Sequence, residues 1–135
     1  MLVVFDTGPL YAALDADDDD HGACAQLLKR SDVRAVIPLL VVTEVGYLAA
    51  TRLGSEVEAK FMEGLTTLDV DCPPAQEWER IAELIRRYDN FPLGAVDASG
   101  VALAERLNTA HVATLDARHF HAVKPAHCEA LQLLP

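Results

Sequence analysis

Four acidic residues occupy positions at which an α/β protein can carry out chemistry: Asp6, Glu44, Asp97 and Asp116. Two of them directly follow a predicted strand, one comes shortly after a strand, and one stands in front of a helix. In open α/β sheets the ligand crevice lies beyond the carboxyl ends of the strands, so we expect all four side chains at the same sheet edge. The neighbouring motifs supply no matching cluster of basic residues.

Without metal, such a cluster would repel itself, and the pKa of some of its members would rise. Two Mg²⁺ or Mn²⁺ ions would balance four carboxylates, and oxygen ligands suit these hard cations. A water bound to one ion can become a nucleophile, while a second ion can stabilise the leaving oxygen during in-line attack at phosphorus. The four acids therefore predict a Mg²⁺ or Mn²⁺ site, with one or two ions, that hydrolyses phosphodiesters.

Each acid also has a purely structural interpretation. Asp97 is a favourable N-cap residue, and Asp6 and Asp116 could be turn residues that bond the next backbone amides. Glu44 could stabilise a helix N-terminus, but it stands among the apolar residues 39–45, where a charge needs a partner. These interpretations are weaker for four acids together than for any one of them.

The elements that must position these acids alternate between strand and helix. Predicted strands are Leu2–Phe5, Val33–Pro38, Thr66–Val70, His111–Leu115 and an edge strand, Leu131–Leu134. Predicted helices are Pro9–Leu14, His21–Arg30, Val41–Arg52, one from Ser55 to Gly64 opened by a Ser55/Glu58 capping box, one that starts at Pro73 and Pro74, Val101–Leu107 behind Asp97, and a short turn after Arg118. This alternation predicts an α/β fold: a three-layer α/β/α sandwich around a mainly parallel sheet of four or five strands. At 135 residues the chain is expected to form a single domain, 1–135.

Composition limits the class of protein. Eleven Lys and Arg against 21 Asp and Glu give a net charge of −10, which argues against a simple basic-groove nucleic-acid binder but not against an enzyme that binds cations. Three cysteines without a C-x-x-C pair fit a reducing compartment. No apolar run approaches the roughly 20 residues that span a bilayer, and the N-terminus lacks signal-peptide features, so we expect a cytoplasmic protein with no membrane partner.

The acidic motifs also carry a family resemblance. Four segments are similar, in order and over nearly the whole chain, to the acidic motifs of PIN-domain nucleases: Val4–Leu10, Pro38–Val45, Asp97–Leu107 and Ala113–Phe120. The early Asp20-His21 pair resembles a feature of the family's small toxin branch. The chain most resembles the VapC toxins of bacterial and archaeal toxin–antitoxin pairs.

The resemblance implies a metal-dependent endoribonuclease with a PIN-like fold that cleaves RNA, dimerises and is inhibited by a small antitoxin protein. It assigns Asp6, Glu44, Asp97 and Asp116 to the metal site and Thr114 to a small polar position beside it. Many members have a further acid near the third motif, where this chain has Gly94, Ala98 and Ser99. A PIN nuclease of RNA processing that is not a toxin is an alternative.

Basic residues near these motifs are candidate substrate contacts. Arg118 could reach a phosphate, because guanidinium groups match phosphate oxygens, or it could neutralise the acidic edge. Arg86, Arg87 and Tyr88 could supply charge and a stacking face for single-stranded RNA, or simply end a helix with favourable cations.

Other features are not predicted to form the site. Asp15, Asp17 and Asp19 alternate as in an EF-hand, but that loop's required Gly and its bidentate Glu are missing. His119 and His121 are interpreted as surface or packing residues rather than metal ligands. Apolar residues at helical spacing predict core or dimer contacts; these are Phe61, Leu65, Trp78, Leu84 and Ile85.

Two other classes of protein compete with the nuclease. A receiver-like phosphoacceptor module would use Asp69, Asp71, Thr114 and Lys124, but Lys124 comes only ten residues after Thr114, too few for a helix and a strand. A haloacid-dehalogenase-type phosphatase needs an acid where Gly8 stands.

Overall fold

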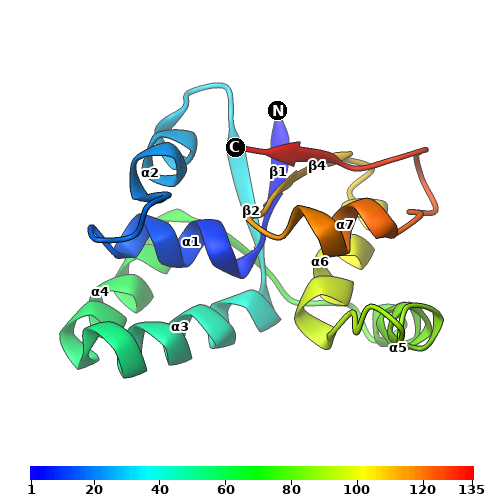
Figure 1. The fold of residues 1–135 in the computed structure, drawn as a ribbon, viewed down its shortest axis with the longest axis horizontal. Coiled ribbons are helices and arrows are strands. Elements are labelled where there is room, and N and C mark those ends of the chain that lie inside the picture. Colours follow the sequence, from blue (N-terminus) through cyan, green and yellow to red (C-terminus); the bar gives the residue numbers. More distant parts are fainter.

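A computed structural model describes residues 1–135, and a five-stranded sheet runs through its centre (Figure 1). The strands are β1 (Leu2–Phe5), β2 (Arg34–Pro38), β3 (Asp69–Asp71), β4 (His111–Ala113) and β5 (Gln132–Leu134). They lie in the order β3-β2-β1-β4-β5, and every neighbouring pair is parallel. The predicted α/β class with a parallel sheet is therefore confirmed, and the C-terminal edge strand is present.

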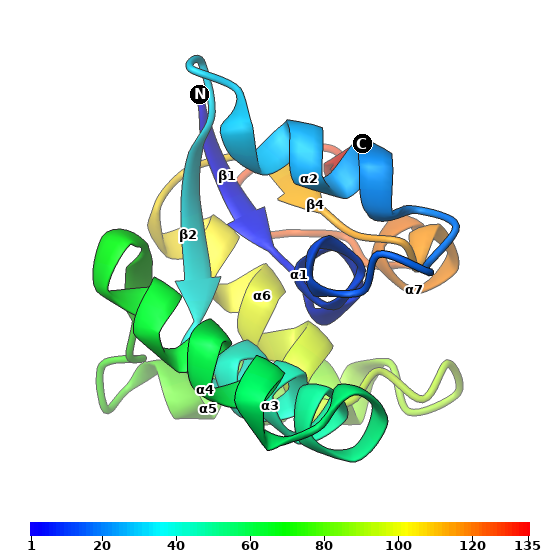
Figure 2. The ribbon, with the colours of Figure 1, turned by 90° about the vertical axis from the view of Figure 1, so that its left-hand side faces the viewer.

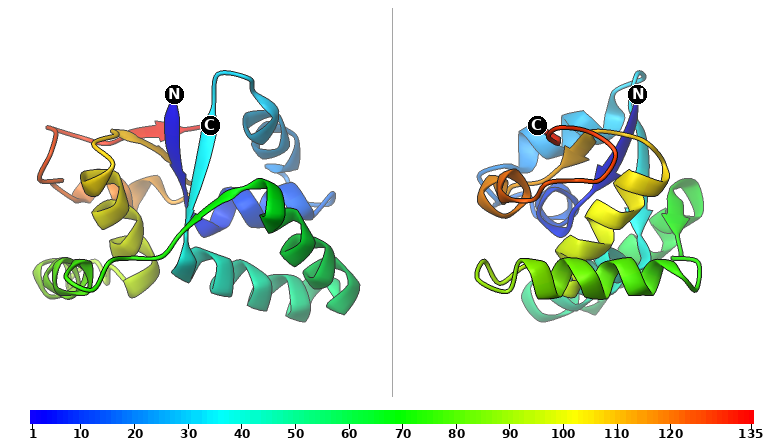
Figure 3. Two further views of the ribbon diagram at one scale, coloured as in Figure 1. Left: turned by 180° about the vertical axis from the view of Figure 1, so that it is seen from behind. Right: turned by 90° about the vertical axis from the view of Figure 1, so that its right-hand side faces the viewer.

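Helices cover both faces of this sheet (Figures 2 and 3). They are α1 (Thr7–Leu14), α2 (His21–Lys29), α3 (Leu39–Leu53), α4 (Ser55–Gly64), α5 (Glu77–Arg87), α6 (Ala95–Arg106) and α7 (Ala117–Ala122), with a 3₁₀ turn at Leu65–Thr67. Helices α1 to α4 lie on one side, and α5 to α7 lie on the other (Figure 1). None of the helices is both long and apolar enough to cross a bilayer.

The alternation of side chains along β1 divides the core into two clusters. Val3 and Phe5 point into the cluster under α1 to α4, whereas Val4 points into the cluster under α5 to α7. All three are completely buried. Because both faces of the sheet are covered by apolar side chains, a polar site has to lie beyond the ends of the strands.

Helix α6 lies close to the sheet and approaches β1, β2 and β4. Its residues 98–100 are small and buried, and a side chain at Gly100 would be in van der Waals contact with the Phe120 ring, 3.8 Å away. The helix begins at Ala95, well before the predicted start at Val101, because its small residues continue the helical packing. Asp97 is therefore in the first turn, and the predicted N-cap position belongs to Gly94.

The predicted capping box at Ser55 and Glu58 is also wrong. Gly54 has a φ of 96°, which a glycine adopts readily, and it separates α3 from α4. Because Gly54 itself occupies the N-cap position, Ser55 is already helical and its side chain caps nothing. The amide of Glu58 donates instead to the Gly54 carbonyl (3.2 Å).

The third strand is shorter than predicted. The hydroxyl groups of Thr66 and Thr67 donate back to the carbonyls of Glu63 and Gly64, 2.9 Å in each case, and extend the helical turn. Pairing with β2 therefore starts only at Asp69.

The segment around Trp78 also differs from the prediction. Helix α5 begins at Glu77, after a turn in which the Glu77 amide donates to the Pro74 carbonyl (2.9 Å). Trp78 is 42% exposed, which leaves only the predicted dimer contact for it, whereas Phe61 and Leu84 are in the core, as predicted.

Candidate active site

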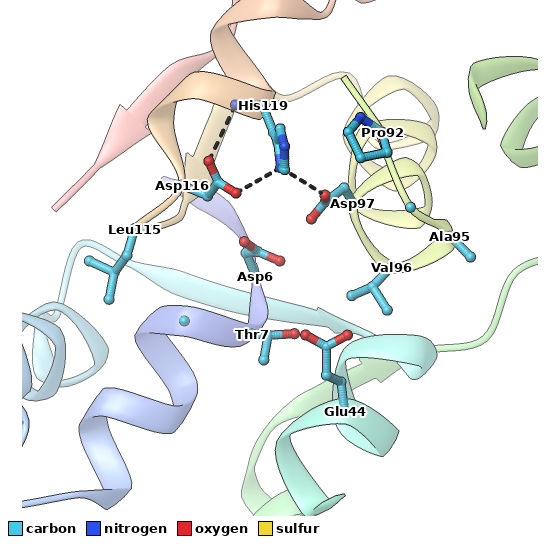
Figure 4. A pocket seen from close by; sticks show the side chains of 12 residues that line it. Asp6, Thr7, Glu44, Pro92, Ala95, Val96, Asp97, Leu115, Asp116 and His119 are labelled. Atoms are coloured by element: carbon cyan, nitrogen blue, oxygen red, sulfur yellow. Dashed lines mark hydrogen bonds and ion pairs between the residues drawn. The ribbon is translucent and has the colours of Figure 1, made fainter. Parts of the chain in front are cut away.

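The four predicted acids meet in an open cleft of about 720 Å³ beyond the carboxyl ends of β1, β2 and β4 (Figure 4). Twelve residues line it: Asp6, Thr7, Gly8, Glu44, Pro92, Gly94, Ala95, Val96, Asp97, Leu115, Asp116 and His119. They come from segments far apart in sequence, which the parallel sheet and its helices bring to one edge. No Lys or Arg lines the cleft.

Asp6 is the most deeply placed of the acids, at 8% exposed. It leaves β1 and occupies the N-cap position of α1, but its side chain does not cap that helix. Its amide donates to the Ala113 carbonyl (2.9 Å), and its Oδ2 accepts a hydrogen bond from the Thr114 hydroxyl (2.8 Å). The side chain is therefore directed into the cleft by a neighbouring strand.

Thr114 links the first and last acids of the cleft. It is buried, and besides donating to Asp6, its Oγ1 accepts the amide of Asp116 (3.0 Å). Asp116 is the N-cap of α7, and its Oδ1 accepts the backbone amide of His119 (3.4 Å). Asp116 is thus partly a structural cap, and its other oxygen, Oδ2, lies 2.7 Å from His119 Nδ1 in the cleft.

Glu44 and Asp97 come from helices on opposite sides of the sheet. Glu44 is exposed, makes no ion pair and lies beyond the first turn of α3, because that helix begins at Leu39 rather than at the predicted Val41. Its apolar neighbours Val42 and Val45 are buried. The prediction that Glu44 needs a partner to offset its apolar surroundings is therefore wrong.

The pKa values of the buried acids reflect the absence of Lys and Arg from the cleft. Burial, followed by the negative charge of Asp6, raises the pKa of the Asp97 carboxyl to about 6. His119 opposes that rise, whereas Asp116 and Glu44 add to it. Burial also raises the pKa of Asp6, although hydrogen bonds from the Thr7 amide and the Thr114 hydroxyl act in the other direction. The cleft contains more negative charge than its own residues can neutralise.

Two polar atoms in the cleft have no hydrogen-bond partner. Only three buried side-chain nitrogen or oxygen atoms in the chain lack one, and Thr7 Oγ1 and His119 Nδ1 both belong to cleft residues. Thr7 is 7% exposed, and its oxygen points toward the Glu44 carboxylate (Figure 4). His119 Nδ1 faces the carboxylates of Asp116 and Asp97 without an aligned hydrogen bond, so Thr7 Oγ1 is the atom that indicates room for a ligand, because buried polar atoms are rarely left unpaired.

The donor chemistry of the cleft fits a hard divalent cation. Its ligand atoms are carboxylate oxygens with a nearby hydroxyl, the set that Mg²⁺ and Mn²⁺ prefer. As the side chains are arranged here, no three His, Cys, Asp or Glu residues could hold an ion together. Glu44 and Asp116 are exposed, so their carboxylates can rotate toward the two deeper ones.

The predicted basic contacts lie outside the cleft. Arg118 is exposed on α7, and Arg86 and Arg87 are exposed in the last turn of α5. The Arg87 guanidinium lies over the Tyr88 ring, 5.7 Å from its centre. The Tyr88 hydroxyl accepts the Lys124 amide (2.9 Å), which joins the end of α5 to the segment after α7.

Two cleft residues were missed or misinterpreted at the level of sequence. Thr7 was not singled out, although it directly follows Asp6. His119 was interpreted as a surface or packing residue, but it is 17% exposed and lines the cleft. The available signal was its position three residues after Asp116, which places both on one side of a helix start.

The residues of the receiver-like alternative have other roles in the structure. Asp69 is paired with Arg34 (2.9 Å), and Asp71 is paired with Arg106. The Lys124 amine donates to the Glu129 carbonyl (3.0 Å). Thr114 donates to Asp6 in the carboxylate cleft, so it is not joined to these two acids.

Comparison with known proteins agrees with the geometry. The PIN-domain family model matches residues 3–125. The chain is 34% identical over 125 residues to Ribonuclease VapC26 of Mycobacterium tuberculosis, which covers 91% of this chain and 93% of that protein.

Solved structures share the fold. Mycobacterium tuberculosis VapC20, a Sarcin-Ricin loop cleaving toxin, superposes with a TM-score of 0.80 at 20% identity, covering 96% of this chain and 99% of that one. VapBC2 from Rickettsia felis, bound to a DNA fragment from its promoter, gives 0.73 at 17% identity and covers both chains completely. A toxin–antitoxin complex from Klebsiella pneumoniae gives 0.67 at 21% identity, covering 93% of this chain and 99% of that one. The chain with the carboxylate cleft therefore belongs to the PIN-domain family, among relatives of the VapC ribonucleases.

Proposed function

We propose that this protein is a metal-dependent endoribonuclease that hydrolyses RNA phosphodiester bonds and is the toxin of a type II toxin–antitoxin pair. The observation that carries the proposal is the convergence of Asp6, Glu44, Asp97 and Asp116 in a cleft without a single Lys or Arg. Kinship with a VapC ribonuclease over nearly the whole chain supports the same activity.

The four carboxylates are the residues that would hold one or two Mg²⁺ or Mn²⁺ ions. When bound, these ions supply an activated water and stabilise the negative charge that develops on the phosphate oxygens. The orphaned Thr7 hydroxyl and the raised pKa of Asp97 support a site that is complete only with a cation.

The protein's own contribution is positioning. Thr114 donates to the Asp6 carboxylate and accepts the backbone amide of Asp116, so it holds the side chain of the first acid close to the backbone of the last. Thr7 lines the cleft, and its hydroxyl, which has no partner in the protein, can donate a hydrogen bond to a bound phosphate oxygen. Asp6 is buried, so its carboxylate is held by protein groups rather than by solvent.

Substrate contacts are assigned to three of the cations that make no ion pair. Arg30, Arg34, Arg80 and Arg106 are all engaged in ion pairs. Arg118, Arg86 and Arg87 have no such partner and lie on α7 and the end of α5, on the side of the sheet that also supplies Asp97. They are the groups that can attract RNA phosphates to a protein whose net charge is −10.

The same acidity suits a basic segment of a small cognate antitoxin, whose own Arg or Lys could enter the carboxylate cleft. Two structural neighbours are toxin–antitoxin assemblies, which supports this partner. We also propose a homodimer, which would pool the few free cations of two chains, and a cytoplasmic location, where RNA is available.

A cleavage assay on total RNA tests the activity, with Mg²⁺ or Mn²⁺ titrated in and the cut ends mapped. Cleavage should require the metal and disappear in folded Asp6→Asn and Asp97→Asn variants. Asp69→Asn is the matched control, because Asp69 is exposed and distant from the cleft. Undiminished cleavage in excess EDTA, or in either folded variant, would rule the mechanism out.

Toxicity is a separate test. Induced expression should arrest growth, and Asp97→Asn should relieve the arrest. If the active wild-type enzyme leaves growth unaffected, the protein is instead a PIN nuclease of RNA processing.

A further inference from the structure

His119 stands between two of the cleft acids (Figure 4). Its Nδ1 lies 2.7 Å from Asp116 Oδ2 and 3.4 Å from Asp97 Oδ2. This nitrogen is buried, and it has no hydrogen-bond partner elsewhere in the protein. We infer that His119 is a positioning residue whose ring nitrogen sets the relation of Asp97 to Asp116 and thereby supports metal binding, an inference that rests on the proposed function.

The two carboxylates need such a residue because they belong to different elements. Asp97 comes from the first turn of α6, and Asp116 comes from the connection between β4 and α7. No hydrogen bond joins them, and both are negative in a partly buried cleft. An electropositive group between them offsets their repulsion and keeps them near each other.

His119 is itself held firmly. Its backbone amide donates to Asp116 Oδ1 (3.4 Å), so the residue is attached to one of the acids that it contacts. The next residue, Phe120, is 1% exposed and fixes α7 against the core. The backbone of His119 is therefore held by Asp116 on one side and by the buried Phe120 on the other, and the imidazole enters the cleft from this fixed position.

The nitrogen, rather than the volume of the ring, is the relevant feature. The short distances to both carboxylates converge on Nδ1, although neither contact is aligned as a hydrogen bond. In Figure 4 the two carboxylates flank the imidazole, so the same ring nitrogen interacts with both of them. An apolar ring of similar size would leave the same oxygens desolvated without a polar neighbour.

Mn²⁺ binding measured by calorimetry at a fixed pH tests this role independently of cleavage. His119→Phe keeps the ring but removes the nitrogen, and it should weaken Mn²⁺ binding by about 10- to 100-fold, the range typical of groups that orient metal ligands. His119→Asn places an amide nitrogen close to the position of Nδ1 and should restore most of the affinity. His119→Gln moves the amide nitrogen outward and should not.

His121→Phe is the matched control, since His121 is exposed on the same helix and does not line the cleft. It should bind Mn²⁺ like the wild type. Circular dichroism and melting temperature establish that each variant is folded. In addition, cleavage by His119→Phe should recover toward the wild-type kcat as Mn²⁺ is raised to saturation.

Two outcomes overturn the inference while the proposed function survives: wild-type Mn²⁺ affinity in folded His119→Phe, or failure of folded His119→Asn to restore binding. A wild-type protein that binds no Mn²⁺ and cleaves RNA in EDTA overturns both. The two failures are therefore distinguishable.

Discussion

Two groups of carboxylates in this protein have the same chemistry and opposite environments. One is the carboxylate cleft. The other, the α5–α6 seam, is formed by Asp71, Glu77, Arg80, Glu105 and Arg106. In the seam, Arg80 binds both oxygens of Glu105 at 2.8 Å, and Arg106 binds Glu77 at 2.7 Å.

The pKa of Glu105 in the seam and the pKa of Asp97 in the cleft shift in opposite directions. Burial acts to raise the pKa of Glu105, yet hydrogen bonds from Arg80 and the Ala126 amide outweigh it and bring the pKa below its usual value. In the cleft, burial and like charge raise the pKa of Asp97 to about 6 because no guanidinium is near. An acid matched by arginine stabilises the fold, whereas acids left unmatched mark a place for an external cation.

The largest expected effect separates the two groups by activity. Asp97→Asn should reduce RNA cleavage by at least about 10²- to 10³-fold, because it removes a charge that acts in the transition state. The seam variant Glu105→Gln should keep its activity per folded molecule. Initial rates at saturating Mg²⁺ measure both, and equal losses would show that the two groups do not differ in function.

The next effect is on stability, and it contrasts the seam with an ion pair on the protein surface. Arg106→Ala should destabilise the fold by about 2–3 kcal/mol, since it leaves Glu77, 8% exposed, without its cation. Arg34→Ala breaks an ion pair that is exposed on both sides, and it should change stability by less than about 0.5 kcal/mol. Urea unfolding monitored by circular dichroism measures both, and similar losses would contradict the distinction.

A smaller effect is a gain in stability, opposite to the loss expected for Arg106→Ala. The folded-state pKa of Asp97, about 6, lies above its ordinary 3.8, so the folded protein takes up the proton first and loses stability as the pH rises through 6. Metal-free Asp97→Asn should therefore be more stable than the wild type at pH 7.5, by about 1–2 kcal/mol. Its advantage should vanish below pH 4. Thermal melts in EDTA across this range test the sign, and a variant that is less stable at pH 7.5 would refute it.

The smallest effect concerns the free cations. Arg87→Gln or Arg118→Gln should raise KM for RNA about two- to five-fold, leave kcat unchanged and lower the salt dependence of binding by about 0.7 per lost phosphate contact. Lys60→Gln, on α4 across the sheet, is the control. A change in kcat alone would place these arginines in the chemistry rather than in substrate attraction.

The sheet edge was predictable because Asp6 and Asp116 each follow a short apolar segment, and parallel strands align their carboxyl ends. The helix after β2 brings Glu44 to the same edge for the same reason. The strand and helix types were right, and so was the break between two helices at Gly54, whereas the boundaries near Thr66 and Gly94 and the cap at Ser55 were wrong. Those features depend on hydroxyl back-bonds, on close packing and on which residue takes a positive φ, none of which has a periodic pattern.

His119 and Thr7 were beyond prediction for a different reason. A histidine on a short helix has the same local sequence whether its ring faces solvent or a cleft, and only the packing of Phe120 decides the direction of α7. Thr7 gains importance from lacking a partner, which is a property of the folded state. Sequence therefore indicates the acids, while the residues that orient them emerge from tertiary packing.

The pairing of β5 with β4 has a consequence for local unfolding. The Thr114 amide donates to the Leu134 carbonyl (2.9 Å), and the Thr114 hydroxyl donates to Asp6 Oδ2, so β5 supports the strand position of the residue that orients Asp6. An edge strand of three residues is held by few backbone hydrogen bonds, and such segments open at a lower free energy than the core. Opening of β5 alone therefore loosens the orientation of Asp6 while the rest of the fold stays intact.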